Sequence, residues 1–474
     1  MTGRYEYLKS TPMPVPASSL AAWHFRSGAI HRLIPPWENI RVKREASPLV
    51  DGARAEIEIR KGPIKLELVA VHSDVVAGEQ FVDEQLTGPF GSWRHRHRFI
   101  AEGGGSRLED KIVYDPPFGI LGRLGQRVFH RELDRQFAFR HARTREDLRR
   151  HAEFNERFGA TRLRVGVTGA SGLVGRQLCA FLSTGGHDVV RFVRGNPRGP
   201  SERSWNPLDA ERGMTPESVE DLDVVVHLAG EGIADGRWNA ARKQRIRESR
   251  TIGTAAVARA IASARTKPRA FISASAIGYY GNRGDERVDE RSAPGTGYLA
   301  DVVTAWEDAT VAARDAGVRT VHARVGVVLA SAGGALARMR LPFLMGAGGP
   351  IGNGQQGMSW ISLDDLVAGL VFLALNDGVR GAVNLVAPAA VPQRAFAKEL
   401  GRVLGRPAFA PLPAFVVRAL FGEMGQRLLL EGAFVRPSVL ERERFRFAHP
   451  TLDAAFRLEL GRLNPETSSA GQQS

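Results

Sequence analysis

Residues 163–175 read Leu-Arg-Val-Gly-Val-Thr-Gly-Ala-Ser-Gly-Leu-Val-Gly, and this stretch is the clearest indication of the fold of the second half of the chain. The apolar run 163–168 predicts a strand, and a helical pattern follows at 173–183. Glycines at this spacing allow a tight turn, a close approach of backbone to a pyrophosphate and close packing of helix on strand. Free N–H groups in the first helical turn suit phosphate oxygens. We therefore predict a dinucleotide site built from Thr168, Gly169, Ser171, Gly172, Leu173, Val174 and Gly175.

The rest of the second half alternates strands with helices. Further apolar runs, separated by longer helical patterns, predict strands at 188–193, 222–228, 270–275, 320–325 and 382–386. Such alternation is typical of a parallel sheet covered on both faces. We therefore predict an α/β Rossmann domain with a doubly wound parallel sheet at 163–392, a proline-broken C-terminal helical segment at 393–462 and a disordered tail at 463–474.

The end of the second strand indicates which nucleotide binds. NAD sites usually place an acidic residue there, which accepts a hydrogen bond from the ribose 2′-hydroxyl. This chain reads Arg191-Phe192-Val193-Arg194, with no carboxylate beside the strand end. The Arg194 guanidinium can pair with a 2′-phosphate through charge-assisted hydrogen bonds. The prediction is NADP, although Arg194 also has a plain reading as one more surface arginine.

The first third of the chain has a different pattern. Alternation of apolar and polar residues predicts antiparallel strands at 53–60, 64–71, 80–86, 92–100 and 107–114. One strand and then two short helices within 17–34 precede these strands, and a long helix over about 121–151 follows them. Its apolar stripe is Leu121, Leu124, Val128, Leu133 and Phe137. We predict an α+β domain at 1–154 and a linker at 155–162, with 149–161 as an exposed hinge.

This element order resembles the helix-grip fold of START-like proteins of the polyketide cyclase/dehydrase superfamily. The resemblance covers about residues 1–154 and includes Trp93-x-His95-x-His97-x-Phe99. It implies a curved sheet that grips the long helix around an apolar cavity, with a small, lipophilic molecule as ligand. A solidly packed scaffold domain is the competing interpretation.

His95 and His97 share one face of the strand at 92–100. Two histidines at this spacing supply two metal ligands, but the sequence names no third. We therefore assign no metal and read both side chains as hydrogen-bonded histidines.

The second half resembles an extended short-chain dehydrogenase/reductase, and within it the NADP-binding epimerase family proteins. Besides 168–175, the matching stretches include Val226-His227-Leu228-Ala229-Gly230, Ser273–Gly281 and Trp360–Asp365. The resemblance implies cofactor contacts from Leu228, Ala229, Gly230 and Ser275.

Active members of that superfamily use a Ser or Thr together with YxxxK. Here Tyr298 is present, but Val302 stands at the lysine position. A valine cannot hold a ribose or supply a positive charge. Ser275 stays the candidate for the serine role, and Tyr279, Tyr280 and Tyr298 are candidate proton donors. Each also has a structural interpretation, as a strand-end hydroxyl or as a pocket wall.

Charge, hydropathy and cysteine content limit the classes of function that this chain can have. The chain of 474 residues carries a formal charge of +14, but basic and acidic residues are interleaved and no nucleic-acid-binding signature is present. No segment predicts a membrane span or a secretory signal, and the single cysteine, Cys179, excludes an internal disulfide. We expect a cytoplasmic NADP-dependent oxidoreductase or epimerase that acts on a small or lipophilic substrate. The alternative is a non-catalytic NADP-responsive binding protein, and the oligomeric state is left open.

Overall fold

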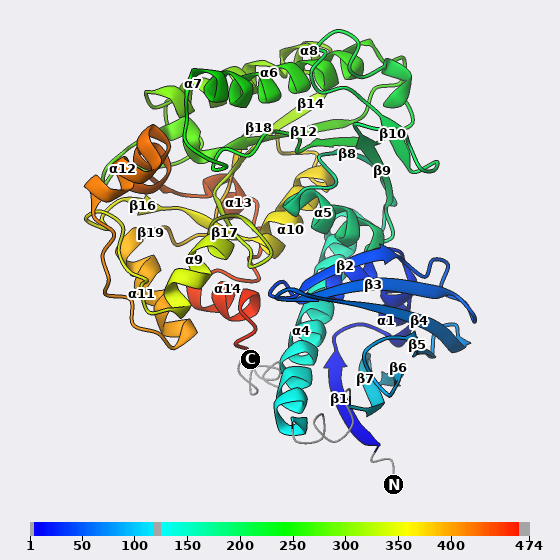
Figure 1. Ribbon diagram of the computed structural model, residues 1–474. Coiled ribbons are helices and arrows are strands. Elements are labelled where there is room, and N and C mark those ends of the chain that lie inside the picture. Colours follow the sequence, from blue (N-terminus) through cyan, green and yellow to red (C-terminus); the bar gives the residue numbers. More distant parts are fainter. Residues whose placement is uncertain (1–3, 117–124, 464–474) are drawn as a thin grey trace. The chain divides into compact units, whose positions relative to one another are not determined.

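The computed structural model describes residues 4–116 and 125–463 (Figure 1). The chain forms two compact units. Of the described residues, the first contains 4–116 and 125–160 with the segments 180–186 and 457–463, and the second contains 161–179 and 187–456. Each unit is described by itself.

The first unit is built on one antiparallel sheet of seven strands, in the order β1-β7-β6-β5-β4-β3-β2. Alternating burial along β7 reflects the period-two pattern that predicted these strands. The predicted strands are confirmed, whereas β2 was missed. The strands are β1 (Tyr5–Met13), β2 (Asn39–Arg44), β3 (Arg54–Lys61), β4 (Ile64–Val76), β5 (Gln80–Thr87), β6 (Ser92–Glu102) and β7 (Gly105–Asp115).

Among the described residues up to 160, the helices of this unit are α1 (Ala17–Phe25), α2 (Ala29–Leu33) and α4 (Gln126–Phe158). Leu133 and Phe137 of α4 are buried, and the Phe137 ring lies 5.4 Å from the Tyr7 ring of β1. The helix-grip assignment itself stays a prediction.

Two expectations about α4 were wrong. Val128 is 71% exposed and therefore does not belong to the buried stripe. The exposed hinge predicted at 149–161 is helical as far as Phe158, and Phe154 is only 3% exposed. Charged residues dominate this stretch, so its sequence pattern did not indicate that Phe154 is buried. Leu121 and Leu124 lie outside the described residues.

The second unit is built on a parallel sheet of seven strands, in the order β10-β9-β8-β11-β12-β14-β18. The order reverses direction between β8 and β11, as in a doubly wound fold. This confirms the predicted Rossmann architecture, although the short β10 was missed. The strands are β8 (Arg164–Thr168), β9 (Asp188–Val193), β10 (Glu202–Ser204), β11 (Val224–His227), β12 (Ala270–Ala276), β14 (Arg319–Val325) and β18 (Gly381–Leu385).

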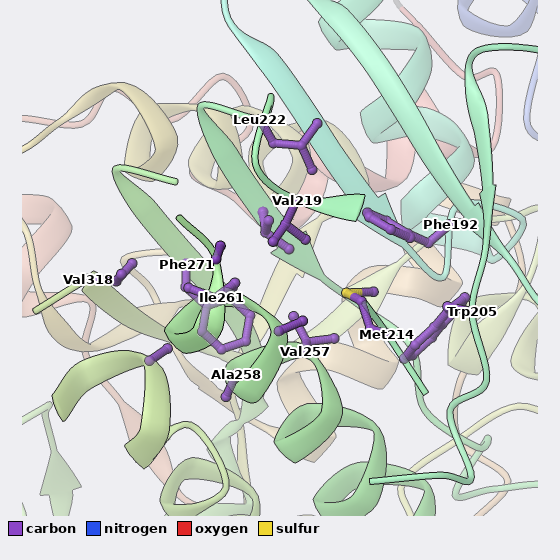
Figure 2. Packing of buried hydrophobic residues seen from close by; sticks show 14 of the residues in the cluster. Phe192, Trp205, Met214, Val219, Leu222, Val257, Ala258, Ile261, Phe271 and Val318 are labelled. Carbon is purple, nitrogen blue, oxygen red and sulfur yellow. The ribbon is translucent and has the colours of Figure 1, made fainter. Parts of the chain in front are cut away.

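Helices cover both faces of this sheet (Figure 1). One core cluster joins the sheet to α6: Phe192, Phe271, Val257 and Ile261 are all at most 3% exposed (Figure 2). The helices outside the C-terminal segment are α5 (Leu173–Thr184), α6 (Ala240–Ser263), α7 (Tyr298–Asp308), α8 (Val311–Asp315), α9 (Gly334–Leu344) and α10 (Leu363–Leu375).

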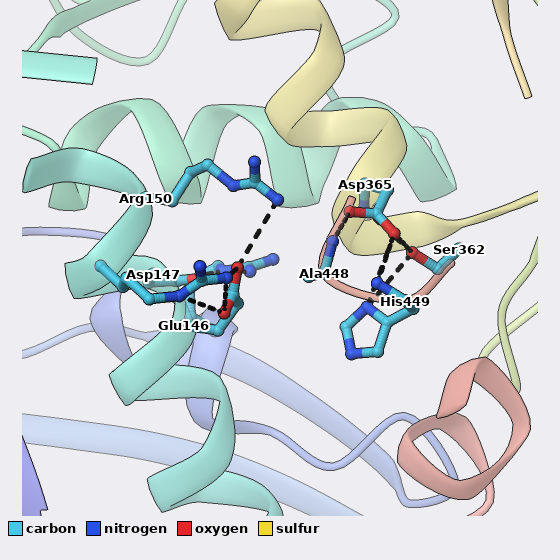
Figure 3. Close-up of polar contacts among 9 residues, drawn as sticks. Glu146, Asp147, Arg150, Ser362, Asp365, Ala448 and His449 are labelled. Atoms are coloured by element: carbon cyan, nitrogen blue, oxygen red, sulfur yellow. Dashed lines mark hydrogen bonds and ion pairs between the residues drawn. The ribbon is translucent and has the colours of Figure 1, made fainter. Parts of the chain in front are cut away.

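The C-terminal segment consists of short helices, as predicted. They are α11 (Gln393–Leu404), α12 (Ala414–Gly425), α13 (Ser438–Arg442) and α14 (Leu452–Glu459). Asp365, at the start of α10, ties this segment to the sheet domain. Its carboxylate accepts hydrogen bonds from the backbone N–H groups of Ala448 and His449 at 2.7 and 2.9 Å and from the Ser362 hydroxyl at 2.9 Å (Figure 3). The predicted tail at 463–474 lies outside the described residues, apart from its first residue.

Across residues 4–116 and 125–463, no helix is both long enough and apolar enough to span a bilayer.

Candidate active site

The turn from β8 to α5 has the geometry expected of a pyrophosphate cradle. Gly169 has φ +67°, and an added Cβ there would lie 2.9 Å from the Ala229 backbone nitrogen. A Cβ on Gly175 would lie 2.2 Å from the Gly169 carbonyl oxygen, so only glycine lets α5 pack against the turn. At the exposed Gly172 the nearest atom to such a Cβ is that same oxygen, at 3.2 Å, and its other sides are open. The space is therefore left for a ligand at the middle glycine.

Thr168 ties this turn to the neighbouring strand end. Its hydroxyl oxygen accepts from the backbone N–H groups of Leu228 and Ala229 at 3.2 and 3.4 Å. Because those donors occupy its lone pairs, the hydroxyl proton points to Nδ1 of His227, 2.7 Å away. Burial lowers the pKa of His227 to about 4, so the ring is neutral at neutral pH. The segment Leu228-Ala229-Gly230 is thereby held beside the glycine turn.

The predicted phosphate-facing residues lie at this same edge of the sheet. Ser171 is exposed, and Leu173 and Val174 form the first turn of α5. Gly230 is exposed and follows β11 by three residues. Because β8 and β11 pair in parallel, their carboxyl ends meet at the switch point where dinucleotides bind in such folds.

Arg194 follows the last residue of β9, which pairs with β8. Its side chain is exposed, and within the described part of the chain it has neither a hydrogen bond nor an ion pair. The guanidinium is therefore available to an anion at the carboxyl end of the second strand. These residues fit a dinucleotide that carries a 2′-phosphate.

Ser275 lies at the carboxyl end of β12 and is part of a buried polar network. Its hydroxyl donates to Glu307 Oε1 at 2.6 Å. Arg324, its register partner on β14, holds both oxygens of Glu307 at 2.8 Å. Burial alone would raise the pKa of Glu307, but the hydrogen bonds and charge of Arg324 outweigh it and lower that pKa. The network is therefore an ionised pair at neutral pH.

The two adjacent tyrosines have different surroundings. Tyr280 is fully buried; its hydroxyl donates to Asn384 Oδ1 at 2.8 Å and accepts from Arg324 at 3.0 Å. Burial, only partly offset by Arg324, raises the pKa of Tyr280 to about 12. Tyr279 is half-buried, and the Arg324 guanidinium carbon lies 3.4 Å from the centre of its ring. Both tyrosines thus contact the cation that holds Glu307.

Tyr298 belongs to a different group of residues. Its hydroxyl donates to the Lys243 carbonyl oxygen at 2.7 Å, and its ring stacks edge-on with Trp238. The Lys243 ammonium lies 4.5 Å from the Tyr298 ring centre and pairs with Glu423 at 3.0 Å. Val302, at the position of the usual lysine, is 2% exposed and part of the core. The structure therefore brings Ser275, Tyr279 and Tyr280 around one cation and gives Tyr298 separate partners.

Sequence reasoning assigned no role to Glu307 or Arg324. Glu307 stands nine residues beyond Tyr298 on α7, outside the YxxxK spacing. Arg324 was one arginine among the 65 basic residues of the chain. The available signal was positional: both Ser275 and Arg324 come near the carboxyl ends of predicted parallel strands, where functional residues gather.

A doubly wound sheet with a glycine turn at its switch point is typical of α/β proteins with a dinucleotide-binding fold. This class includes epimerases and dehydratases. A model of the NAD dependent epimerase/dehydratase family matches residues 165–385, and one of a domain of unknown function, DUF1731, matches residues 412–458. An epimerase family protein of Mycobacterium bovis is 44% identical over 291 residues, which are 61% of this chain and 95% of that protein.

Two solved structures are similar as well. The nucleoside-diphosphate sugar epimerase from Corynebacterium glutamicum is 32% identical with a TM-score of 0.80, over 96% of this chain and 90% of that one. The human epimerase family protein SDR39U1, solved with NADPH, is 36% identical with a TM-score of 0.58, over 64% of this chain and 100% of that one. The chain belongs to the epimerase family proteins of the NAD-dependent epimerase/dehydratase family.

Proposed function

We propose that this protein is an NADP(H)-dependent oxidoreductase or epimerase that acts on a small, lipophilic substrate. The observation that carries the proposal is the cradle at Gly172, which lies at the switch point and has an available cation, Arg194, at the next strand end. The NADPH in the human relative's structure supports the choice of nucleotide. When bound, the nicotinamide supplies or accepts a hydride.

The polar network around Ser275 supplies the groups for the proton. In this proposal the Ser275 hydroxyl keeps its proton on Glu307, which fixes its orientation, and the Ser275 oxygen accepts a hydrogen bond from the hydroxyl form of the substrate. Tyr279, the more accessible of the paired tyrosines, donates or accepts the proton. Arg324 lies against the Tyr279 ring and supplies the positive charge that Val302 cannot, because a fixed cation stabilises charge that develops on a nearby oxygen.

Tyr280 and Tyr298 have supporting parts in this account. The buried Tyr280 hydroxyl holds Arg324 in place through its hydrogen bond. Tyr298 holds the start of α6 through the Lys243 carbonyl. The first unit, which resembles a START-like domain, is assigned the binding of a lipophilic substrate or product.

The test is NADPH oxidation by the full chain with a panel of lipophilic ketones and aldehydes. We expect enzyme-dependent oxidation with at least one carbonyl class, above the rate of an Arg324→Met variant. Tight NADPH binding without oxidation across the panel would replace this proposal with a non-catalytic NADP-responsive binding protein.

A further inference from the structure

The first unit contains a buried histidine–carboxylate cluster that the nucleotide chemistry does not use. Asp83 lies on β5 directly opposite His95 of β6, and Asp110 lies on β7 directly opposite His97. His95 is 3% exposed, His97 is 8% exposed and Asp110 is 3% exposed. Since His95 and His97 are two residues apart on one strand, both rings point into the same side of the sheet.

The two histidines turn different nitrogens to different carboxylates. Nε2 of His95 and Nδ1 of His97 lie 2.8 and 2.7 Å from the same oxygen of Asp110. The opposite nitrogens, Nδ1 of His95 and Nε2 of His97, both face one oxygen of Asp83, at 3.3 and 3.4 Å. Asp110 therefore holds one side of each ring, and the other sides converge on Asp83.

The distances of 3.3 and 3.4 Å between these two ring nitrogens and the Asp83 oxygen match the spacing between ligand atoms around one metal ion. Zinc binds histidine nitrogen and carboxylate oxygen at about 2.0–2.2 Å, so neighbouring ligands of a tetrahedral ion lie about 3.3 Å apart. A hydrogen bond to a carboxylate is normally shorter, about 2.7–2.9 Å. The three converging atoms lie within 4.8 Å of one another, which leaves room for one ion at their centre.

We propose that Asp83, His95 and His97 form a binding site for a divalent first-row transition metal of the Zn²⁺ type. The ligands are His95 Nδ1, His97 Nε2 and an oxygen of Asp83. Asp110 is a positioning residue: it accepts a hydrogen bond from Nε2 of His95 at 2.8 Å, and the same oxygen lies 2.7 Å from Nδ1 of His97. A carboxylate beside the other ring nitrogen is the usual second partner of a metal-bound histidine. The site supplies the third ligand that the sequence did not name.

Further contacts hold the positioning carboxylate. Nε2 of His141, on α4, lies 2.6 Å from the second oxygen of Asp110, and its Nδ1 lies 2.8 Å from the Thr11 hydroxyl of β1. Among the described residues, the ion-pair partners of Asp83 and Asp110 are His95, His97 and His141 alone. The buried Arg140 guanidinium supplies a further positive charge that acts on both carboxylates, and a bound ion would require an unprotonated ligating nitrogen on each ring.

Three protein ligands leave one tetrahedral position open. Sites of this composition bind a water or a ligand oxygen at that position, whereas purely structural zinc sites are closed by four protein ligands. The proposed metal ion in the first unit therefore keeps one coordination position for a water molecule or another oxygen ligand. This inference does not depend on the function proposed for the second unit.

The test uses the full chain after treatment with a chelator. Co²⁺ is titrated in as a spectroscopic probe, and Zn²⁺ competition and elemental analysis give affinity and stoichiometry. We expect one equivalent per chain and the visible absorption of tetrahedral Co²⁺. Asp83→Asn and His97→Gln should each weaken binding by about 100-fold or more, and Asp110→Asn by about 10–100-fold. His31→Gln, which removes a histidine outside the cluster, should leave binding unchanged.

Two results would overturn the proposal. One is wild-type protein that takes up less than one equivalent of either ion or shows no tetrahedral Co²⁺ spectrum; both histidines are then structural partners of the carboxylates. The other is binding that survives both ligand substitutions, which places the ion elsewhere. If a variant does not fold by circular dichroism, the wild-type titration and spectrum decide alone.

Discussion

The Ser275 hydroxyl and the Glu307 carboxylate are 2.6 Å apart, and Arg324 holds that carboxylate through both of its oxygens. In the usual short-chain dehydrogenase pattern a lysine lies four residues after the tyrosine. Here that position is buried valine, and the cation nearest to Ser275 through this network comes from a neighbouring strand instead. In this account Arg324 on β14 takes the place of a lysine on α7. It can do so because the parallel strands β12 and β14 end at the same edge of the sheet, next to Ser275.

Removal of either end of this hydrogen bond should lower turnover more than substrate binding. Ser275→Ala and Glu307→Gln should each reduce kcat by about 100-fold, since positioned acid–base groups contribute roughly 10²–10⁴-fold. The KM and the NADPH Kd should change by less than about threefold, as expected when an interaction acts mainly in the transition state. Ser273→Ala, on the same strand, is the matched control and should keep wild-type kcat. Equal losses in kcat for the control and for Ser275→Ala would show a general disturbance of β12.

The glycines of the turn should separate folding from nucleotide binding. A Cβ at Gly175 meets the Gly169 carbonyl at 2.2 Å, so Gly175→Ala should destabilise the second unit by about 1–3 kcal/mol. Gly172→Ala meets that oxygen at 3.2 Å and should change stability by less than about 0.5 kcal/mol. It should nevertheless weaken NADPH binding by about tenfold or more, because the methyl group fills the cradle. Chemical unfolding and calorimetry measure the two effects, and equal stability losses would contradict this reading of the turn.

His227 should make the second unit sensitive to acid. Its folded pKa of about 4 lies below the ordinary histidine value of 6.5, so between these two pH values the unfolded chain binds more protons than the folded one. Stability from the neutral ring is fully present above pH 6.5 and is lost as pH falls toward 4, by up to about 1.4 kcal/mol per pH unit.

The measurement for His227 is the slope of the unfolding free energy against pH, compared between wild type and His227→Gln. The variant should have the shallower slope in that window, whatever its stability at neutral pH. Other buried histidines, such as His24, contribute equally to both proteins and cancel in the difference. Parallel curves would mean that His227 is protonated without cost in the folded state.

The sheet architecture of both units was predictable because it rests on local periodicity. The glycine turn at 163–175 and the alternating strands before Tyr114 each carry their signal within about ten residues. By contrast, the first unit includes segments 180–186 and 457–463, and contacts between distant segments leave no periodic trace in the sequence. The domain predicted at 1–154 therefore omits part of the compact unit.

The candidate site was predictable in the same uneven way. Thr168 to Gly175 follow from chemistry that needs a fixed spacing. Sheet register places Arg324 beside Ser275 and Asp83 beside His95, and the packing of α7 brings Glu307 to the first pair. Local sequence carries no signal for these contacts. The third metal ligand was missed for this reason: Asp83 is separated from His95 by a hairpin and meets it only as a cross-strand pair.

Isothermal calorimetry with NADPH and NADH tests whether the glycine turn and Arg194 form an NADP(H) site. The wild type should bind NADPH more tightly by about 1.5–3 kcal/mol, roughly 10–150-fold, because Arg194 is available to the 2′-phosphate. Arg194→Ala should remove most of that preference and leave the NADH affinity unchanged, whereas Arg198→Ala, a nearby exposed arginine, should leave both affinities unchanged. Equal affinity of the wild type for the two nucleotides would contradict the assignment of an NADP(H) site.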